Sequence, residues 1–183
     1  MSAPPGAPAG AAAADLLVRE VTRPDEVEAL VPLLLLAEPS ERALRWSLAH
    51  LSDAVYRLDA EGRLAGAATV RWNDDPCEIV ELAVDPARHG RGLGKRFVAW
   101  LVAEAGRRGK RAVEVGTANA SIGNIAFYQK CGFRMDRVRH DYFRYHREPV
   151  VEHGIVVRDL LVFRYDLAGA RAPREPAAPR RQR

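Results

Sequence analysis

Cysteine is scarce in this sequence, which has only Cys77 and Cys131 among its 183 residues. Two cysteines cannot form a disulfide framework, and these two lack the paired spacing of a structural zinc site. A chain of this length buries enough apolar surface to fold without such cross-links. The sequence therefore predicts a domain with no disulfides and no metal, in a reducing compartment such as the cytoplasm.

Long apolar runs are also missing. No segment approaches the ~20 apolar residues that cross a membrane as a helix, and the longest run, residues 29–37, is interrupted by Pro32. Residues 1–14 are rich in Pro, Ala and Gly and lack the basic start and apolar core of a secretory signal. We therefore expect a cytoplasmic protein with no membrane partner.

Most of the chain has no excess of either charge. The formal net charge of +4 comes from residues 168–183, where five arginines accompany one glutamate. Residues 1–14 carry no charged side chain, so basic and acidic residues balance over 15–167. We expect a folded domain over 15–167 between two disordered tails, 1–14 and 168–183. Arginine-rich tails attract phosphate without sequence preference, so a nucleic-acid tether stays open, but no specific nucleic-acid partner is expected.

The hydrophobic pattern predicts a mixture of strands and helices. Apolar residues spaced three and four apart indicate helices, and short β-prone runs bounded by turn residues indicate strands. The expected strands are 16–21, 55–58, 64–72, 77–84, 112–116, 133–145 and 155–165, and the expected helices are 24–34, 40–51, 93–105 and 121–130. This order predicts an α/β (α+β) fold with a mixed sheet.

A glycine-rich loop between a strand and a helix carries the clearest chemical signal. The sequence CEIVELAV-DPARHGRG-LGKRF places Gly90, Gly92 and Gly94 where the chain enters a helix, with Arg91 and Lys95 among them. Glycines allow main-chain N–H groups to approach a ligand closely. The first N–H groups of the helix have no internal partner and lie at the positive end of its dipole. The segment therefore predicts a phosphate-binding loop, and a tight turn that binds nothing is the alternative.

Two common phosphate motifs do not fit this loop. A P-loop would need glycine at His89 and Ser or Thr at Arg96, and a dinucleotide fingerprint would need glycine at Lys95. No acidic residue ends the following strand at the distance that a dinucleotide-binding unit requires. A pyrophosphate bound without magnesium or nicotinamide suggests a coenzyme A thioester.

The loop resembles a family motif. The stretch LAVDPARHGRGLGKRF is similar to the acyl-CoA pyrophosphate motif of the GNAT acyltransferases, Gln/Arg-x-x-Gly-x-Gly/Ala. Gly92 and Gly94 match that motif, and His89 departs from its first position. Farther along, AFYQKCGF resembles the closing signature of the same superfamily, and TANASIGNIAFYQKCGF with EPVVEHGI resembles a bacterial subgroup of uncertain substrate.

The resemblance implies a fold and a cosubstrate. The fold would be a mixed, mostly antiparallel central sheet flanked by helices, with two central parallel strands splayed to admit acetyl-CoA. The main chain of Leu82, Ala83 and Val84 would pair with the pantetheine arm. Asn119, or else Asn124, would contact the pantetheine or the acyl end, although both also suit helix capping and turns. The pyrophosphate would be held by the loop residues His89, Gly90, Arg91, Gly92, Leu93, Gly94 and Lys95.

The resemblance also implies catalytic residues. Tyr128 occupies the position of the tyrosine that protonates the leaving thiolate and lines the cofactor site, although it could simply be a packed aromatic. Glu81 and Glu78 compete for the role of base. The alternative is that neither is the base and that an arginine such as Arg71 pairs with a carboxylate across the sheet. Because side chains alternate along a strand, we expect these two glutamates to point to opposite faces.

The implied activity is N-acetyl transfer from acetyl-CoA to a primary amine, by direct attack in a ternary complex. A small-molecule acceptor is favoured, selected by the first two helices near Trp46 and by the loop 136–154. A protein or peptide N-acetyltransferase and a catalytically silent acyl-CoA-binding module are the alternatives. The expected partners are therefore acetyl-CoA and an amine, with the chain a monomer or a homodimer.

Overall fold

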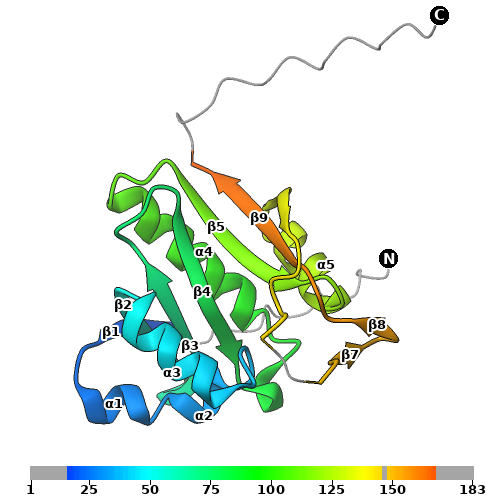
Figure 1. Cartoon of the computed structure of the whole chain (residues 1–183). Coiled ribbons are helices and arrows are strands. Elements are labelled where there is room, and N and C mark those ends of the chain that lie inside the picture. The colour runs from blue at the N-terminus through cyan, green and yellow to red at the C-terminus, as the bar shows by residue number, and fades with distance from the viewer. Residues whose placement is uncertain (1–15, 146–147, 168–183) are drawn as a thin grey trace, which may run out of the picture.

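The computed structural model describes residues 16–145 and 148–167. The predicted tails, residues 1–14 and 168–183, lie outside the described residues. The strands are β1 (Leu16–Val21), β2 (Ala54–Ala60), β3 (Arg63–Arg71), β4 (Cys77–Val84), β5 (Ala112–Ala118), β6 (Arg134–Arg139), β7 (Val151–Glu152), β8 (Ile155–Val156) and β9 (Leu160–Asp166) (Figure 1). The α-helices are α1 (Pro24–Glu28), α2 (Val31–Leu34), α3 (Glu41–His50), α4 (Leu93–Arg107) and α5 (Ile122–Lys130), and a short 3-10 helix spans Pro86–Arg88.

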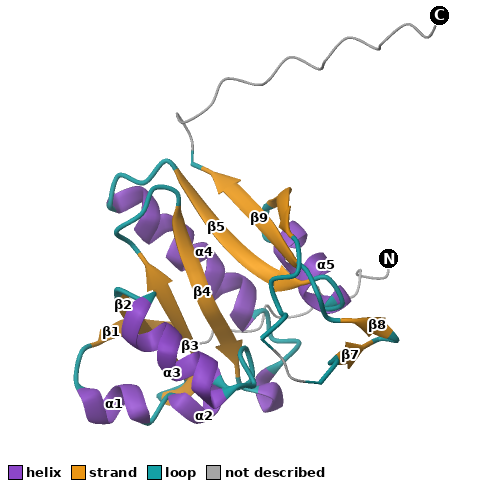
Figure 2. Ribbon diagram, viewed as in Figure 1, coloured by secondary structure: helices purple, strands orange, loops and turns teal. Residues whose placement is uncertain are grey.

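The described strands form one large sheet and one small hairpin. The seven-stranded sheet has the order β1-β2-β3-β4-β5-β9-β6, and β7 pairs with β8 (Figure 2). Within the large sheet β4 and β5 run parallel, and every other described pair is antiparallel. The predicted mixed, mostly antiparallel sheet with a central parallel pair is therefore confirmed.

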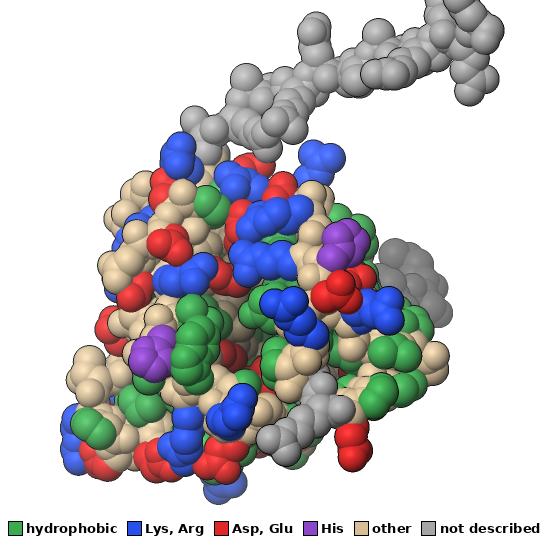
Figure 3. Space-filling view, viewed as in Figure 1, with side chains coloured by type: hydrophobic (Ala, Val, Ile, Leu, Met, Phe, Trp, Pro, Cys, Tyr) green, Lys and Arg blue, Asp and Glu red, His purple; other side chains and the backbone are tan. Residues whose placement is uncertain are grey.

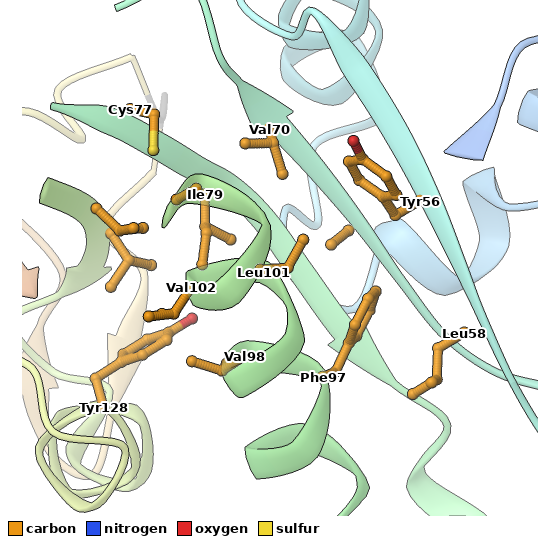
Figure 4. Close-up of a cluster of buried hydrophobic side chains, with 14 of the residues drawn as sticks. Tyr56, Leu58, Val70, Cys77, Ile79, Phe97, Val98, Leu101, Val102 and Tyr128 are labelled. Atoms are coloured by element: carbon orange, nitrogen blue, oxygen red, sulfur yellow. The ribbon is translucent and has the colours of Figure 1, made fainter. Parts of the chain in front are cut away.

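Helices cover the two faces of this sheet. Figure 4 shows Phe97 and Leu101 of α4 packed against side chains of the strands such as Tyr56, and these residues are almost completely buried. On the opposite face α2 and α3 pack through a second buried cluster that includes Leu34 and Leu44. Within the described residues, no helix is long and apolar enough to span a membrane.

Several predicted elements have different lengths in the structure. The single helix expected over 24–34 is two short helices, because Pro32 lacks an N–H donor and lies in the first turn of α2. The strand expected over 133–145 ends at Arg139 and turns at Asp141, which has a left-handed φ of 53°. The strand expected over 155–165 is divided into β8 and β9. The predicted boundaries of β1 and β4 match the structure.

Candidate active site

The parallel strands β4 and β5 separate halfway along β4. Their register covers only Cys77, Glu78 and Ile79 of β4, although β4 continues to Val84 (Figure 1). On its other edge, β4 shifts register against β3, because Thr69 opposes Glu81 whereas the next β3 residue opposes Ile79. One residue of β4, Val80, is therefore a β-bulge. A bulge bends its strand and increases the twist, which explains why β4 leaves β5 at this point.

The separation leaves one edge of β4 without a neighbouring strand over residues 80–84. This segment contains Leu82, Ala83 and Val84, the residues predicted to pair with an extended ligand through their main chain. At its end, the His89 ring Nε2 lies 3.0 Å from the carbonyl oxygen of Val84. Because a carbonyl only accepts, Nε2 is the donor. His89 thus fastens the loop to the end of β4.

Glycines shape the loop that follows β4. Gly90 and Gly92 have left-handed φ angles of 78° and 72°, and no atom lies within 4 Å of where a Cβ would stand at either residue. Gly92 caps α4, so the N–H groups of Leu93, Gly94 and Lys95 lie in its first turn, where a helix supplies no acceptors. These N–H groups and the helix dipole favour an anion at this position.

Two other predicted loop residues have identifiable neighbours. A Cβ at Gly94 would lie 3.3 Å from Cζ of Phe127, so this glycine also allows α4 to approach α5 closely. The Arg91 guanidinium lies 3.8 Å from the Glu61 carboxylate, and both side chains are more than half exposed. An exposed pair of this kind contributes little stability, so Arg91 can exchange Glu61 for a phosphate at small cost.

Glu81 is a buried carboxylate held by hydroxyl groups. Its residue is only 6% exposed. Ser47 Oγ of α3 lies 2.5 Å from Oε1, and the Thr69 hydroxyl of β3 contacts Oε2. Burial raises the pKa of Glu81 to about 7, against the lowering effect of the Ser47 hydrogen bond. A carboxylate with such a pKa can accept a proton near neutral pH.

Glu78 has a different environment on the same face of the sheet. Its Oε2 lies 2.5 Å from Nη2 of Arg71, which confirms the expected arginine partner for this residue. Glu78 opposes Arg71, and Glu81 opposes Thr69. Directly opposed residues share a face, and Thr69 and Arg71 are two apart on β3. The prediction that the two glutamates point to opposite faces is therefore wrong, because the bulge at Val80 interrupts the alternation.

Tyr128 of α5 points its hydroxyl into the sheet region where β4 and β5 part. Figure 4 shows the ring among buried side chains with its oxygen toward Val102 and Ile79, the last residue of β4 that pairs with β5. The ring packs edge-on against Phe133. Burial raises the pKa of Tyr128, and no hydrogen bond of its hydroxyl is found within the described residues. The hydroxyl therefore keeps its proton at neutral pH and has it available for donation.

The two candidate asparagines differ clearly. The Asn119 Oδ1 accepts from the main-chain N–H groups of Arg158 and Asp159, at 2.9 and 3.0 Å, and its Nδ2 donates to the Val156 carbonyl at 3.0 Å. These bonds commit its amide to the segment between β8 and β9. Asn124 lies exposed in the first turn of α5. The Asn119 amide is thus engaged within the chain whereas the Asn124 side chain is exposed, and a ligand contact of either asparagine stays a prediction.

Tyr142, Tyr145 and Glu38 lie near Glu81 on the same face of the sheet. Tyr145 donates from its hydroxyl to Oε2 of Glu38 at 3.0 Å, which links two segments far apart in the sequence. Burial raises the pKa of Tyr142, and the nearby carboxylates of Glu78, Glu38 and Glu81 raise it further. Figure 3 shows this face hollowed near its centre, with acidic side chains at the floor.

The wall of this hollow that α3 provides is aromatic. With 3.6 residues per turn, Trp46 and His50 lie on the side of Ser47 that is opposite Leu44 and Leu48. The two leucines belong to the core cluster under α3. Trp46 is exposed, and its ring centroid lies 5.3 Å from that of His50. The prediction that residues near Trp46 and in the loop 136–154 flank an acceptor is consistent with this arrangement.

Sequence reasoning did not identify Ser47, Thr69 or Glu38 as parts of this site. Ser47 did carry a signal, because it is a polar residue on the leucine-bearing face of an amphipathic helix. Thr69 and Glu38 become recognisable only once the register of β3 and β4 and the fold of the chain are known. Within residues 16–145 and 148–167, no three His, Cys, Asp or Glu side chains gather closely enough to hold a metal ion.

Comparisons with known proteins agree with this geometry. A family model described as "Acetyltransferase (GNAT) family" matches residues 22–133. An uncharacterized N-acetyltransferase of Bacillus subtilis, YvbK, is 36% identical over 140 residues, which are 75% of this chain and 89% of the relative. A Bacillus subtilis acetyltransferase solved in complex with CoA has 33% identity and a TM-score of 0.75, over 84% of this chain and 99% of that one. An Elizabethkingia anophelis GNAT acetyltransferase with acetyl-CoA bound has 26% identity and a TM-score of 0.72, over 83% and 98%.

Proposed function

This chain belongs to the acetyltransferase (GNAT) family, and from that premise we propose that it transfers the acetyl group of acetyl-CoA to the primary amine of a small cationic molecule. The family membership makes the chain an acetyl-CoA-dependent N-acyltransferase. The proposal adds the acceptor class and the residues that perform the transfer. Glu81 is the proposed base, and Tyr128 is the proposed acid.

One observation carries the assignment of the base. Glu81 is a buried carboxylate with a pKa of about 7, and it has no arginine partner among the described residues. It lies near the start of the open edge of β4, residues 80–84, along which an extended ligand can add as a strand. A base must be ionised at working pH and close to the reacting atoms. Glu78 is the weaker candidate, because its Oε2 is already engaged by Nη2 of Arg71.

The binding of acetyl-CoA follows from the same strand and its loop. Solved relatives hold CoA or acetyl-CoA. In this chain the main chain of Leu82–Val84 would pair with the pantetheine arm, and the N–H groups from Gly90 to Lys95 would hold the pyrophosphate. On this proposal the thioester would lie where β4 and β5 part, between Glu81 and the hydroxyl of Tyr128.

The reaction balances with these groups alone. The ammonium form of the acceptor first releases one proton to solvent, which gives the nitrogen a lone pair. The neutral amine nitrogen then attacks the thioester carbonyl carbon, and a main-chain N–H at the open edge near Val84 donates to the carbonyl oxygen as its charge grows. The nitrogen passes its proton to Glu81. The carbon–sulfur bond then breaks, and the leaving thiolate takes the Tyr128 proton. Exchange with solvent returns a proton to Tyr128 and removes the one on Glu81.

The acceptor class follows from the hollow beside Glu81. Its floor is acidic, and Glu38 within it has no cationic partner among the described residues, which suits a positively charged amine. The Tyr145–Glu38 hydrogen bond ties the segment before α3 to the segment after β6, and we propose that this link narrows the approach for a long polypeptide. Trp46 offers an aromatic face to a cation. These features favour a small molecule over a protein N-terminus.

The test is acetyl transfer to a panel of amines. The panel contains a diamine, an aromatic monoamine, an aminosugar and a peptide with an N-terminal alanine, and the measurements are thiol release and product mass. We expect transfer to at least one small amine and its loss in Glu81→Gln, with acetyl-CoA binding retained. Transfer to the peptide alone would overturn the acceptor class. Binding of acetyl-CoA without transfer to any amine would indicate a silent binding module.

A further inference from the structure

Two hydroxyl groups from different elements hold the two oxygens of Glu81. Ser47 of α3 contacts Oε1 at 2.5 Å, and Thr69 of β3 contacts Oε2. Both residues are buried, with exposed fractions of 5% and 0%. The carboxylate is therefore fixed from both sides by groups that belong to the folded framework.

A second contact leaves the Thr69 proton available for the Glu81 carboxylate. The main-chain N–H of Glu81 donates to Thr69 Oγ1 at 3.1 Å. A hydroxyl has one proton and can accept while it donates. Because Thr69 accepts from the main chain of Glu81, its own proton is free to donate to the side chain of the same residue. This pairing favours the ionised carboxylate over the protonated acid.

The other groups near Glu81 favour its protonated form. Burial disfavours the charge, and so do the carboxylates of Glu38, before α3, and Glu78, on β4. Arg71 of β3 is occupied by Glu78 at 2.5 Å, and Tyr142 is neutral because its own pKa is raised. The hydroxyls of Ser47 and Thr69 are thus the direct donors that stabilise the charged form of Glu81 among the described contacts.

We propose that Ser47 and Thr69 are positioning residues of the acetyl transfer, whose hydroxyls hold the Glu81 carboxylate in one orientation and keep it ionised to receive the proton of the amine. This inference rests on the proposed function, because it needs Glu81 as the base. It goes further by assigning a role to a residue of α3 and a residue of β3 that do not touch the thioester.

The experiment measures the titration of Glu81 directly and the rate separately. In protein labelled with ¹³C-glutamate, the carboxyl signal that Glu81→Gln removes is followed from pH 4 to pH 10 in wild type, Ser47→Ala, Thr69→Val and the conservative variant Thr69→Ser. We expect its midpoint to rise by about one pH unit in Ser47→Ala and in Thr69→Val. Thr69→Ser keeps the hydroxyl and should titrate as wild type does.

The rate profile uses whichever panel amine is acetylated. In Ser47→Ala the acidic limb of kcat should shift upward with the titration, and kcat at pH 7 should fall about 5- to 10-fold, while the KM for acetyl-CoA is unchanged. An unshifted Glu81 titration in both Ser47→Ala and Thr69→Val overturns the inference. If instead the titration shifts but Glu81→Gln retains full activity, the assignment of Glu81 as base fails, and the positioning role fails with it. Thr69→Val, with its matched control Thr69→Ser, decides the question if Ser47→Ala does not fold.

Discussion

Glu78 and Glu81 lie on the same face of the sheet although they are three positions apart on one strand, a spacing that regular alternation would place on opposite faces. The bulge at Val80 produces this arrangement, because it lets Glu81 oppose Thr69 while Glu78 opposes Arg71. The two carboxylates therefore lie on one face of the sheet with different partners. Arg71 neutralises Glu78 at 2.5 Å, whereas hydroxyls hold Glu81. This division of roles leads to the first prediction.

Replacing each glutamate by glutamine should affect different properties. Glu81→Gln removes the proposed base, so kcat should fall about 100-fold or more at pH 7.5. Glu78→Gln leaves Arg71 with a weaker partner, so the free energy of unfolding should fall by about 1 kcal/mol while kcat changes less than about threefold. Thiol-release kinetics and urea unfolding of both variants measure these effects. If Glu78→Gln has the larger loss of kcat, the two assignments are reversed.

The raised pKa of Glu81 makes the stability of the fold depend on pH. The carboxyl has an ordinary pKa of 4.5 and a pKa of about 7 in the folded chain. The folded state thus binds the proton of Glu81 more tightly than the unfolded state does. This proton stabilises the fold fully below pH 4.5, and the stabilisation is lost as the pH rises through 7. From pH 5 to pH 8 the free energy of unfolding of wild type should fall by about 2 to 3 kcal/mol more than that of Glu81→Gln does. Urea unfolding at both pH values tests this, and equal pH dependence in the two proteins would refute it.

The Tyr128 hydroxyl should matter for catalysis and not for stability. Tyr128→Phe keeps the ring among its aromatic neighbours and removes only the proposed proton donor. We expect kcat to fall about 100-fold with little change in the KM for acetyl-CoA. The free energy of unfolding should stay the same or rise by up to about 1 kcal/mol, because the lost hydroxyl makes no hydrogen bond within the described residues. A clear loss of stability with unchanged kcat would identify Tyr128 as a packing residue.

The charge of Glu38 should influence Glu81 from a distance. The Glu38 carboxylate raises the pKa of Glu81, so Glu38→Gln should shift the acidic limb of the pH–rate profile to lower pH. Glutamine still offers an oxygen to the Tyr145 hydroxyl, which keeps the hydrogen bond between these two segments. Glu28→Gln is a control for the loss of one surface carboxylate, because Glu28 pairs with Arg45 on an exposed surface. An equal shift in both variants would mean that the effect is not local.

The sequence predicted much of the fold because its patterns are local. The strands β1 and β4 match their predicted ranges, since short β-prone runs end at turn residues. Gly92 was predicted at the entry to α4 and caps that helix with a left-handed φ of 72°. These features depend on residues that are close together in the chain.

The arrangement of the site depends on contacts that the sequence pattern does not contain. The bulge at Val80 is a property of how β4 pairs with β3, and period-two alternation within β4 cannot reveal it. The Asn119 amide is hydrogen-bonded to the main chain of Val156, Arg158 and Asp159, which lie nearly forty positions away. Ser47 reaches Glu81 only because α3 crosses that face of the sheet. What the sequence pattern missed at the site therefore came from pairing between different segments, whereas the misjudged lengths of helices and strands had local causes such as Pro32.

The left-handed glycine at the start of α4 provides the last prediction. If alanine at Gly92 kept the φ of 72°, the left-handed conformation would cost about 1 kcal/mol or more, because alanine has a Cβ. If the loop relaxed instead, the N–H groups around it would be displaced. Gly92→Ala should therefore lower the free energy of unfolding by about 1 kcal/mol and raise the KM for acetyl-CoA several-fold. Gly106→Ala in the same helix is the matched control. Gly106 is exposed, has no left-handed φ and has open space at its Cβ position, so alanine there should add about 0.5 to 1 kcal/mol without changing the KM. If Gly92→Ala binds acetyl-CoA as wild type does in calorimetry, the loop does not need this conformation to hold the pyrophosphate.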